Sequence, residues 1–172
     1  MREYDLNHML KSPDLVGVKI KEFLENKVIK KQNVDFEEIK GHILKADNNL
    51  RFVLENIRLG FLDWAIAGCY YACYHAALGV ILTKGYSSKN HLATLCILIK
   101  YLYKKELNEK DIKTLSEFID YQDLLFYVES KNKREDATYS TKSKFDKNEV
   151  ERLRIKAVLL VAKFRSILEK TN

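Results

Sequence analysis

Apolar residues recur every three or four positions through several long segments of the chain, which is the spacing of one face of a helix. In the first such segment, Asp35 and Glu38 form a capping-box pattern and Gly60 is a typical helix end. The apolar positions between them are Phe36, Ile39, Ile43, Ala46, Leu50, Val53 and Ile57. The pattern predicts one long helix over residues 35–60.

A second segment, from Leu62 to Lys84, is apolar almost throughout. Between Trp64 and Thr83 it has no Asp, Glu, Lys or Arg, and this length is sufficient for a membrane-spanning helix. Tyrosines lie in its middle, however, whereas interfacial aromatic residues belong at the ends of a span. We therefore expect the central helix of a bundle, buried nearly all round, and no insertion into a membrane. Small residues along it predict the close approach of a neighbouring helix: Ala65, Cys69, Ala72, Ala76 and Gly79.

Three further helices are predicted from similar patterns. Ser88 is the expected cap of the first, which ends near Lys104. Asn108 with Asp111 begins the second, which runs to about residue 129 and is followed by a polar stretch, residues 130–144. Asp146 begins the last, and its three-four spacing continues to the C-terminal end of the chain.

The first 34 residues are less regular than the rest. Ser12 and Pro13 have the pattern of a helix start, and apolar residues follow at helical spacing, although Val16 to Ile20 also alternates like a strand. We favour a helix there. The whole pattern predicts an all-α fold: an antiparallel up-and-down bundle of about five helices over residues 35–172, with an N-terminal helical appendage at residues 1–34.

The length of the chain agrees with a single domain, and its composition gives a net positive charge. The chain has 172 residues, and its 30 Lys and Arg against 24 Asp and Glu give a net charge of +6, which permits an acidic partner such as nucleic acid. The cysteines Cys69, Cys73 and Cys96 are odd in number and lie in apolar runs, as reduced core cysteines do. The residues near Met1 include too few apolar side chains to form the core of a signal peptide, so a cytoplasmic location is expected.

Common motifs for nucleotide triphosphates and metals are absent: the sequence has no GxxxxGK[ST], GxGxxG, HExxH or CxxC. We expect no cofactor and no metal site. Cys69 and Cys73 share a helix face and could suggest a metal with His75, but His75 follows Cys73 by only two residues and points elsewhere. Core packing of these side chains is the preferred interpretation.

The most distinctive stretch lies in the second predicted helix, with the pattern A-x-x-x-x-Y-Y-A-x-Y-H-A-A from Ala65 to Ala77. A glycine turn and a K-x-H pattern, Lys89 and His91, follow it. Together these features resemble the HEPN domain, a family of small helical-bundle proteins of bacteria and archaea. The segment Arg134 to Tyr139 is similar to an R-x-x-A-D-Y element of that family, with Thr138 where Asp is usual. The resemblance covers about residues 35–170.

The resemblance implies a particular chemistry for catalytic members. They are metal-independent ribonucleases that join an Arg and a His, four to six residues apart, from two chains of a dimer. Histidine has a pKa suited to a base near neutral pH, and arginine supplies a fixed cation for the developing phosphorane charge. In this sequence only Arg2 with His8 has that spacing, and we interpret the pair as chance because it lies in the appendage.

The resemblance therefore favours a non-catalytic, nucleic-acid or nucleotide-associated HEPN-like module. It also implies a homodimer and a minimal nucleotidyltransferase as partner in a toxin-antitoxin-like system. Two alternatives stay open. One is a metal-independent ribonuclease toxin that uses His91 or His75 with Arg134 at a dimer interface, and the other is a non-enzymatic dimeric scaffold.

Candidate residues for binding RNA or a nucleotide are Lys89, His91, Lys131, Lys133, Arg134, Tyr139, Lys142 and Lys144. The basic residues near Tyr139 could contact phosphates while the ring stacks on a base, or they could form a solvated loop. Lys89 and His91 lie where a helix N-terminus would favour an anion. In the alternative interpretation they form a solvated cap, with His91 packed against a tyrosine.

Overall fold

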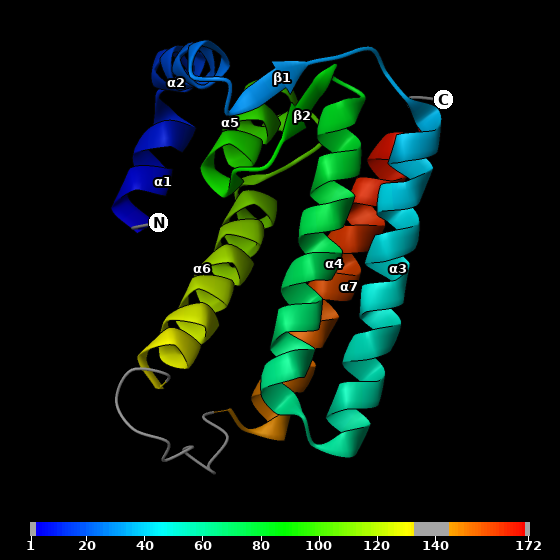
Figure 1. Cartoon of the computed structure of the whole chain (residues 1–172). Coiled ribbons are helices and arrows are strands. Elements are labelled where there is room, and N and C mark those ends of the chain that lie inside the picture. Colours follow the sequence, from blue (N-terminus) through cyan, green and yellow to red (C-terminus); the bar gives the residue numbers. More distant parts are fainter. Residues whose placement is uncertain (1–2, 133–144, 171–172) are drawn as a thin grey trace.

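The computed structural model describes residues 3–132 and 145–170; for residues 3–5 and 122–132 only the backbone is described. Within these ranges the chain is a helical bundle with one very small sheet (Figure 1). The elements are α1 (Glu3–Lys11), α2 (Pro13–Glu25), β1 (Ile29–Lys31), α3 (Phe36–Leu59), α4 (Leu62–Leu82), β2 (Tyr86–Ser88), α5 (His91–Leu102), α6 (Glu109–Asn132) and α7 (Lys147–Glu169). The predicted all-α bundle is confirmed.

The central element is α4, which packs against α3, α6 and α7 along its length (Figure 1). It is long and apolar enough to cross a membrane, but about four fifths of its most apolar stretch is buried inside the bundle. Its apolar character is therefore explained by helices of the same chain. The prediction of a core helix at this position is confirmed.

Local capping fixes where several helices begin. The Asp35 carboxylate accepts hydrogen bonds from the backbone N–H groups of Glu37 and Glu38 at the start of α3, and Gly60 ends that helix with a left-handed φ of 83°. Before α6, Asn108 and Asp111 each accept a hydrogen bond from the other's backbone N–H, at 3.0 and 2.9 Å. Helix starts that carry such side chains were correctly predicted.

The predicted cap at Ser88 is wrong. Ser88 is the last residue of β2, and its hydroxyl exchanges hydrogen bonds with the backbone of Asn90. Asn90 is the residue that caps α5, because its side-chain oxygen accepts from the N–H of Ala93 at 2.9 Å. The helix therefore begins at His91.

The small sheet was not predicted from the sequence. Strands β1 and β2 are antiparallel, with Ile29 opposite Ser88 and Lys31 opposite Tyr86, and each has only three residues, too few to show an alternating pattern. Both α1 and α2 pack on α5, so the N-terminal segment contacts the bundle through a helix pair and a strand. Val16 to Ile20 lies within α2, which confirms the helix preferred there.

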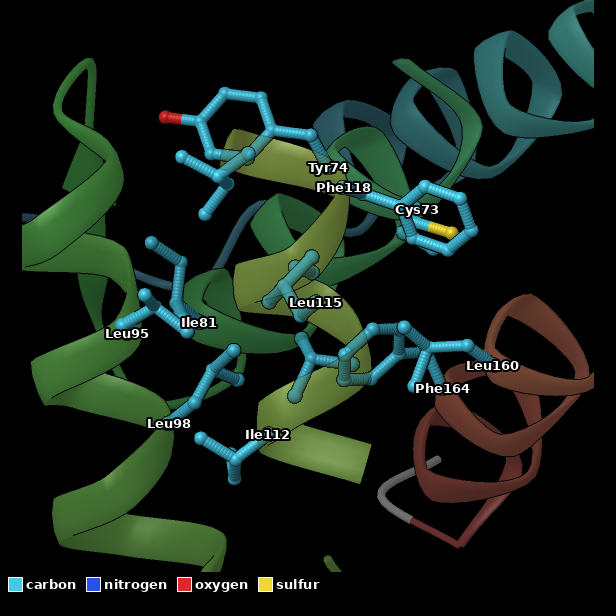
Figure 2. Packing of buried hydrophobic residues seen from close by; sticks show 14 of the residues in the cluster. Cys73, Tyr74, Ile81, Leu95, Leu98, Ile112, Leu115, Phe118, Leu160 and Phe164 are labelled. Carbon is cyan, nitrogen blue, oxygen red and sulfur yellow. The ribbon is translucent and has the colours of Figure 1, made fainter. Parts of the chain in front are cut away.

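One hydrophobic core joins α4, α5, α6 and α7 (Figure 2). Phe118 of α6 and Phe164 of α7 are its largest fully buried side chains. Figure 2 shows Phe118 beside Cys73 of α4 and Phe164 beside Leu160, with Ile81 of α4 and Leu95 and Leu98 of α5 on the other side of Leu115. This packing holds α4 and α5 in a fixed relation, and the residues of the predicted motif lie on these two helices.

Candidate functional site

The tyrosine motif on α4 distributes its side chains over several faces of that helix. Tyr70 and Tyr74, four residues apart, are buried on the face toward α5. Tyr71 is 43% exposed, and His75 contacts α3 instead. The motif is therefore divided between two environments that are on different sides of one helix.

On the α5 side, His91 is packed between the two tyrosines. The Tyr70 hydroxyl lies 2.6 Å from Nε2 of His91, and the Tyr74 ring meets the imidazole edge-on, with centroids 4.8 Å apart. The Tyr74 hydroxyl also lies 3.5 Å from Oγ1 of Thr94. We call Tyr70, Tyr74, His91 and Thr94 the tyrosine–histidine cluster. Of the two interpretations offered for His91, the structure shows packing against a tyrosine.

The position of His91 is determined by the turn before α5. The Asn90 side chain caps the helix, and the Thr94 hydroxyl donates to the Asn90 carbonyl at 3.0 Å. Side-chain and backbone atoms of Asn90 therefore both bond to the first turn of α5. Burial raises the pKa of Tyr74, which keeps its hydroxyl protonated at neutral pH. The cluster is thus a hydrogen-bonded link between α4 and α5.

Lys89 lies outside this cluster. Its exposed side chain lines a pocket of about 890 Å³ between the sheet, the first turns of α3 and the last turns of α4. His91 does not line that pocket. Although Lys89 and His91 are only two residues apart, the fold places their side chains in separate surroundings.

A second histidine contact joins α3 to α4. Nδ1 of His42 lies 3.0 Å from Nδ1 of His75, so one ring donates and the other accepts. Burial lowers the pKa of His75 to about 4, with a further contribution from His42, and burial also lowers the pKa of His42. We call His42 and His75 the histidine pair. Sequence reasoning missed the role of His42, since nothing local to α3 indicates a partner 33 residues away.

The three cysteines are free and buried. Burial raises the pKa of the Cys69 and Cys96 thiols to about 12, and it raises the pKa of Cys73 as well. Neutral thiols in apolar surroundings are poor metal ligands and poor nucleophiles. Over residues 3–132 and 145–170, no three His, Cys, Asp or Glu side chains gather as metal ligands would. Core packing of Cys69 and Cys73 agrees with this burial.

Several predicted site residues fall outside what the structure describes. Lys131 lies on α6, where only the backbone is described. The remaining candidates of the polar stretch lie outside the described residues: Lys133, Arg134, Tyr139, Lys142 and Lys144. The same holds for Arg2. Their roles stay predictions. Among the binding and catalytic candidates predicted from the sequence, the structure positions the side chains of Lys89, His91 and His75.

Comparison with known proteins places the geometry in a family context. A family model described as the HEPN domain matches residues 39–166, about three quarters of the chain. A UPF0332 protein from Archaeoglobus fulgidus is 25% identical over 87 residues, which covers 51% of this chain and 70% of that protein. The range matched by the family model contains both the tyrosine–histidine cluster and the histidine pair.

Proposed function

Because this chain belongs to the HEPN domain family, we propose that it is an RNA- or nucleotide-associated module that does not itself cleave RNA. The observation that carries the proposal is the hydrogen bond between the Tyr70 hydroxyl and Nε2 of His91. A general base needs its nitrogen within reach of the substrate hydroxyl, whereas this nitrogen is engaged in tying α4 to α5. We assign His91 a structural role.

Arginine placement supports the same proposal. The sequence has no arginine between Arg58 and Arg134, so His91 has none at the spacing of four to six residues that the family resemblance implies. An arginine at that spacing would stabilise the negative charge that develops on the phosphorane oxygens, and the sequence around His91 does not supply one. His75, the other histidine candidate, is engaged with His42 on α3.

A purified preparation tests this proposal directly. We expect the full chain to bind a labelled single-stranded RNA, with affinity that falls as salt is raised, and to leave that RNA intact in the presence of EDTA. His91→Ala and Arg134→Ala should show the same absence of cleavage. Metal-independent cleavage that disappears in His91→Ala would establish the ribonuclease alternative and overturn the proposal.

We further propose that the module acts in the cytoplasm with a nucleotidyltransferase-type partner, in a toxin-antitoxin-like system. The cytoplasmic location is supported by the three free, buried cysteines, which suit a reducing compartment. The partner is supported by the family resemblance. Co-purification of the chain with the product of an adjacent nucleotidyltransferase gene would test it.

A homodimer is also part of the proposal. The apolar residues of α4 and α5 are largely buried by the chain itself, whereas exposed apolar side chains lie on other faces. Those on α3, on α4 with the turn before it, and on α7 are Phe36, Leu44, Phe52, Leu54, Leu59, Phe61, Trp64, Tyr71, Ile155, Val158 and Leu159. Leu59, Phe61 and Trp64 gather at the α3–α4 turn, and a two-fold interface could bury the same turn of both chains.

Sedimentation velocity at micromolar concentration measures the oligomeric state and so tests the proposed homodimer. We expect a species of twice the 20.2 kDa chain mass. Trp64, 62% exposed, is the largest apolar side chain of the turn, so Trp64→Glu should shift the population toward monomer. Val18→Glu adds the same charge at an exposed position on α2 and should leave the dimer intact. A monomeric wild-type chain under these conditions would contradict the expectation.

A further inference from the structure

The pocket beside Lys89 is assembled from segments far apart in the chain. The strands β1 and β2 lie beside the end of α4, and the segment after β1 leads from there to the start of α3 (Figure 1); the pocket opens at this end of the bundle. Its volume, about 890 Å³, lies within the range of about 300–1,000 Å³ that is usual for small-molecule sites. The lining residues are Lys27, Val28, Lys30, Gln32, Glu38, His42, Leu78, Ile81, Leu82, Ser87, Ser88, Lys89 and Asn90.

Positive charge dominates this lining. Lys27, Lys30 and Lys89 are all exposed, and in the part of the chain that the structure describes none of them has a carboxylate within ion-pair distance. Glu38 is the single acidic residue of the lining, and its carboxylate already accepts a hydrogen bond from Gln32 at 2.9 Å. Three ammonium groups without carboxylate partners around one concave site favour an anionic ligand.

The rest of the lining defines the kind of anion. The half-buried Val28 and Leu78 supply apolar surface, while Ser87 and Asn90 supply hydroxyl and amide groups. A ligand that satisfies both parts has an apolar or aromatic body and a phosphate group. We propose that the pocket binds a phosphorylated small molecule of mononucleotide size, with its phosphates among Lys27, Lys30 and Lys89. This proposal rests on the nucleotide association proposed above and assigns it a place and a ligand class.

The pocket suits a single small molecule better than a nucleic-acid strand. A strand must continue past the pocket over positive surface, because each phosphate carries charge. Next to the pocket, however, the N-cap residue Asp35 carries a carboxylate, and Lys40 in the first turns of α3 is already paired with Glu37 at 2.6 Å. The start of α3 therefore offers the phosphates of a strand no favourable path away from the pocket.

The N-terminal segment is required for this site. Lys27 and Lys30 come from the turn after α2 and from β1, whereas Lys89 follows β2. The antiparallel pairing sets Lys30 opposite Ser87, so the two sides of the basic rim are joined by the sheet. The segment before residue 35 therefore completes a pocket that the helices of the bundle leave open.

The backbone at Lys27 offers a useful test. This residue has a left-handed φ of 57°, a conformation that suits glycine and costs a side-chain-bearing residue energy. Lys27→Gly removes one positive charge and relieves the backbone at the same time. Weaker binding in this variant together with unchanged or higher thermal stability is attributable to the lost charge and not to unfolding.

Isothermal titration calorimetry of the full chain is the primary experiment. The probes are ATP, AMP, inorganic pyrophosphate and adenosine, each titrated at low and at moderate salt. We expect ATP to bind more tightly than AMP, and adenosine, which has no phosphate, to bind weakest. The affinity for ATP should fall as salt increases, because the contacts are largely electrostatic.

Variants locate the site. Lys30→Ala/Lys89→Ala should weaken ATP binding by about tenfold or more, and Lys27→Gly should weaken it severalfold. Glu38→Gln removes the one acidic group and should strengthen binding. Lys163→Ala, which removes an exposed lysine on α7 away from the pocket, is the matched control and should bind ATP as the wild type does.

The outcomes separate this inference from the proposed function. If ATP, AMP and pyrophosphate all fail to bind at millimolar concentration while RNA binds, the pocket proposal is wrong and the RNA-associated module stands. If RNA fails to bind as well, both are wrong. Nucleotide binding that is equal in the wild type and in the lysine variants would place the ligand elsewhere and overturn the assignment of this pocket.

Discussion

Gly68→Leu should lower the free energy of unfolding by about 3 kcal/mol, because α3 and α4 approach each other at this position with no room for a side chain. A Cβ atom at residue 68 would lie 2.7 Å from Cγ2 of Val53 and 3.1 Å from Cδ1 of Phe52, both on α3. Val53 is fully buried and β-branched, so it has little freedom to move away. The two helices must separate or the new side chain must adopt a strained rotamer.

Urea denaturation followed by circular dichroism measures this loss. For a chain of this size, about 3 kcal/mol corresponds to a drop in Tm of about 6–12 °C. Gly41→Ala is the matched control, because a Cβ at Gly41 meets nothing within 4 Å and alanine is the better helix former. That change should stabilise the protein by about 0.5–1 kcal/mol. Equal stability of Gly68→Leu and the wild type would show that α3 and α4 are not in this contact.

Acid is expected to weaken the protein through the histidine pair. The pKa of His75 falls from an ordinary 6.5 to about 4 on folding, chiefly because of burial. Between these values the unfolded chain binds more protons than the folded one, so stability increases with pH in this window. The contribution of His75 to the free energy of unfolding is fully present above about pH 6.5 and is lost as the pH falls toward 4. The contact needs one neutral ring, and two protonated rings would repel each other.

The size of this effect is limited by the solvent that reaches the ring. The whole shift from 6.5 to about 4 would correspond to about 3 kcal/mol, but His75 is only part-buried and solvent screens it, so we expect about 1–2 kcal/mol. Unfolding free energies at pH 7 and pH 4.5 should therefore differ less in His75→Gln than in the wild type. An unchanged pH dependence in His75→Gln would contradict this account.

Features that depend on neighbouring residues in the sequence were predictable. The spacing of apolar residues located α3, α4, α6 and α7, and capping side chains such as Asp35 and Asp146 gave their starts, since a cap acts on N–H groups two or three residues away. The start of α5 was misplaced for a related reason. Ser88 and Asn90 are both suitable caps, and pairing of Ser88 with Ile29 in the sheet leaves Asn90 to cap the helix.

Features that depend on distant residues were not predictable. The small residues chosen for a close helix approach included Gly79 but omitted Gly68, because a one-dimensional pattern does not say which face of α4 meets α3. In the candidate site, the motif included Tyr70 and His91, which are 21 residues apart and in contact, but it did not indicate that they touch. That Lys89 belongs to a different pocket follows from strand pairing, which the sequence pattern does not reveal.

The pairing of β1 with β2 also has a consequence for the order of folding. Ile29 pairs with Ser88, and both α3 and α4 lie between these two residues in the sequence. The long segment between them must therefore be brought together before this contact can contribute to stability. The α3–α4 hairpin, in contrast, is joined by a short turn and forms from local contacts. We expect the hairpin to fold early and the strand pair late. The basic pocket then comes into existence only in the last step, so a molecule that binds there selects chains whose folding is complete.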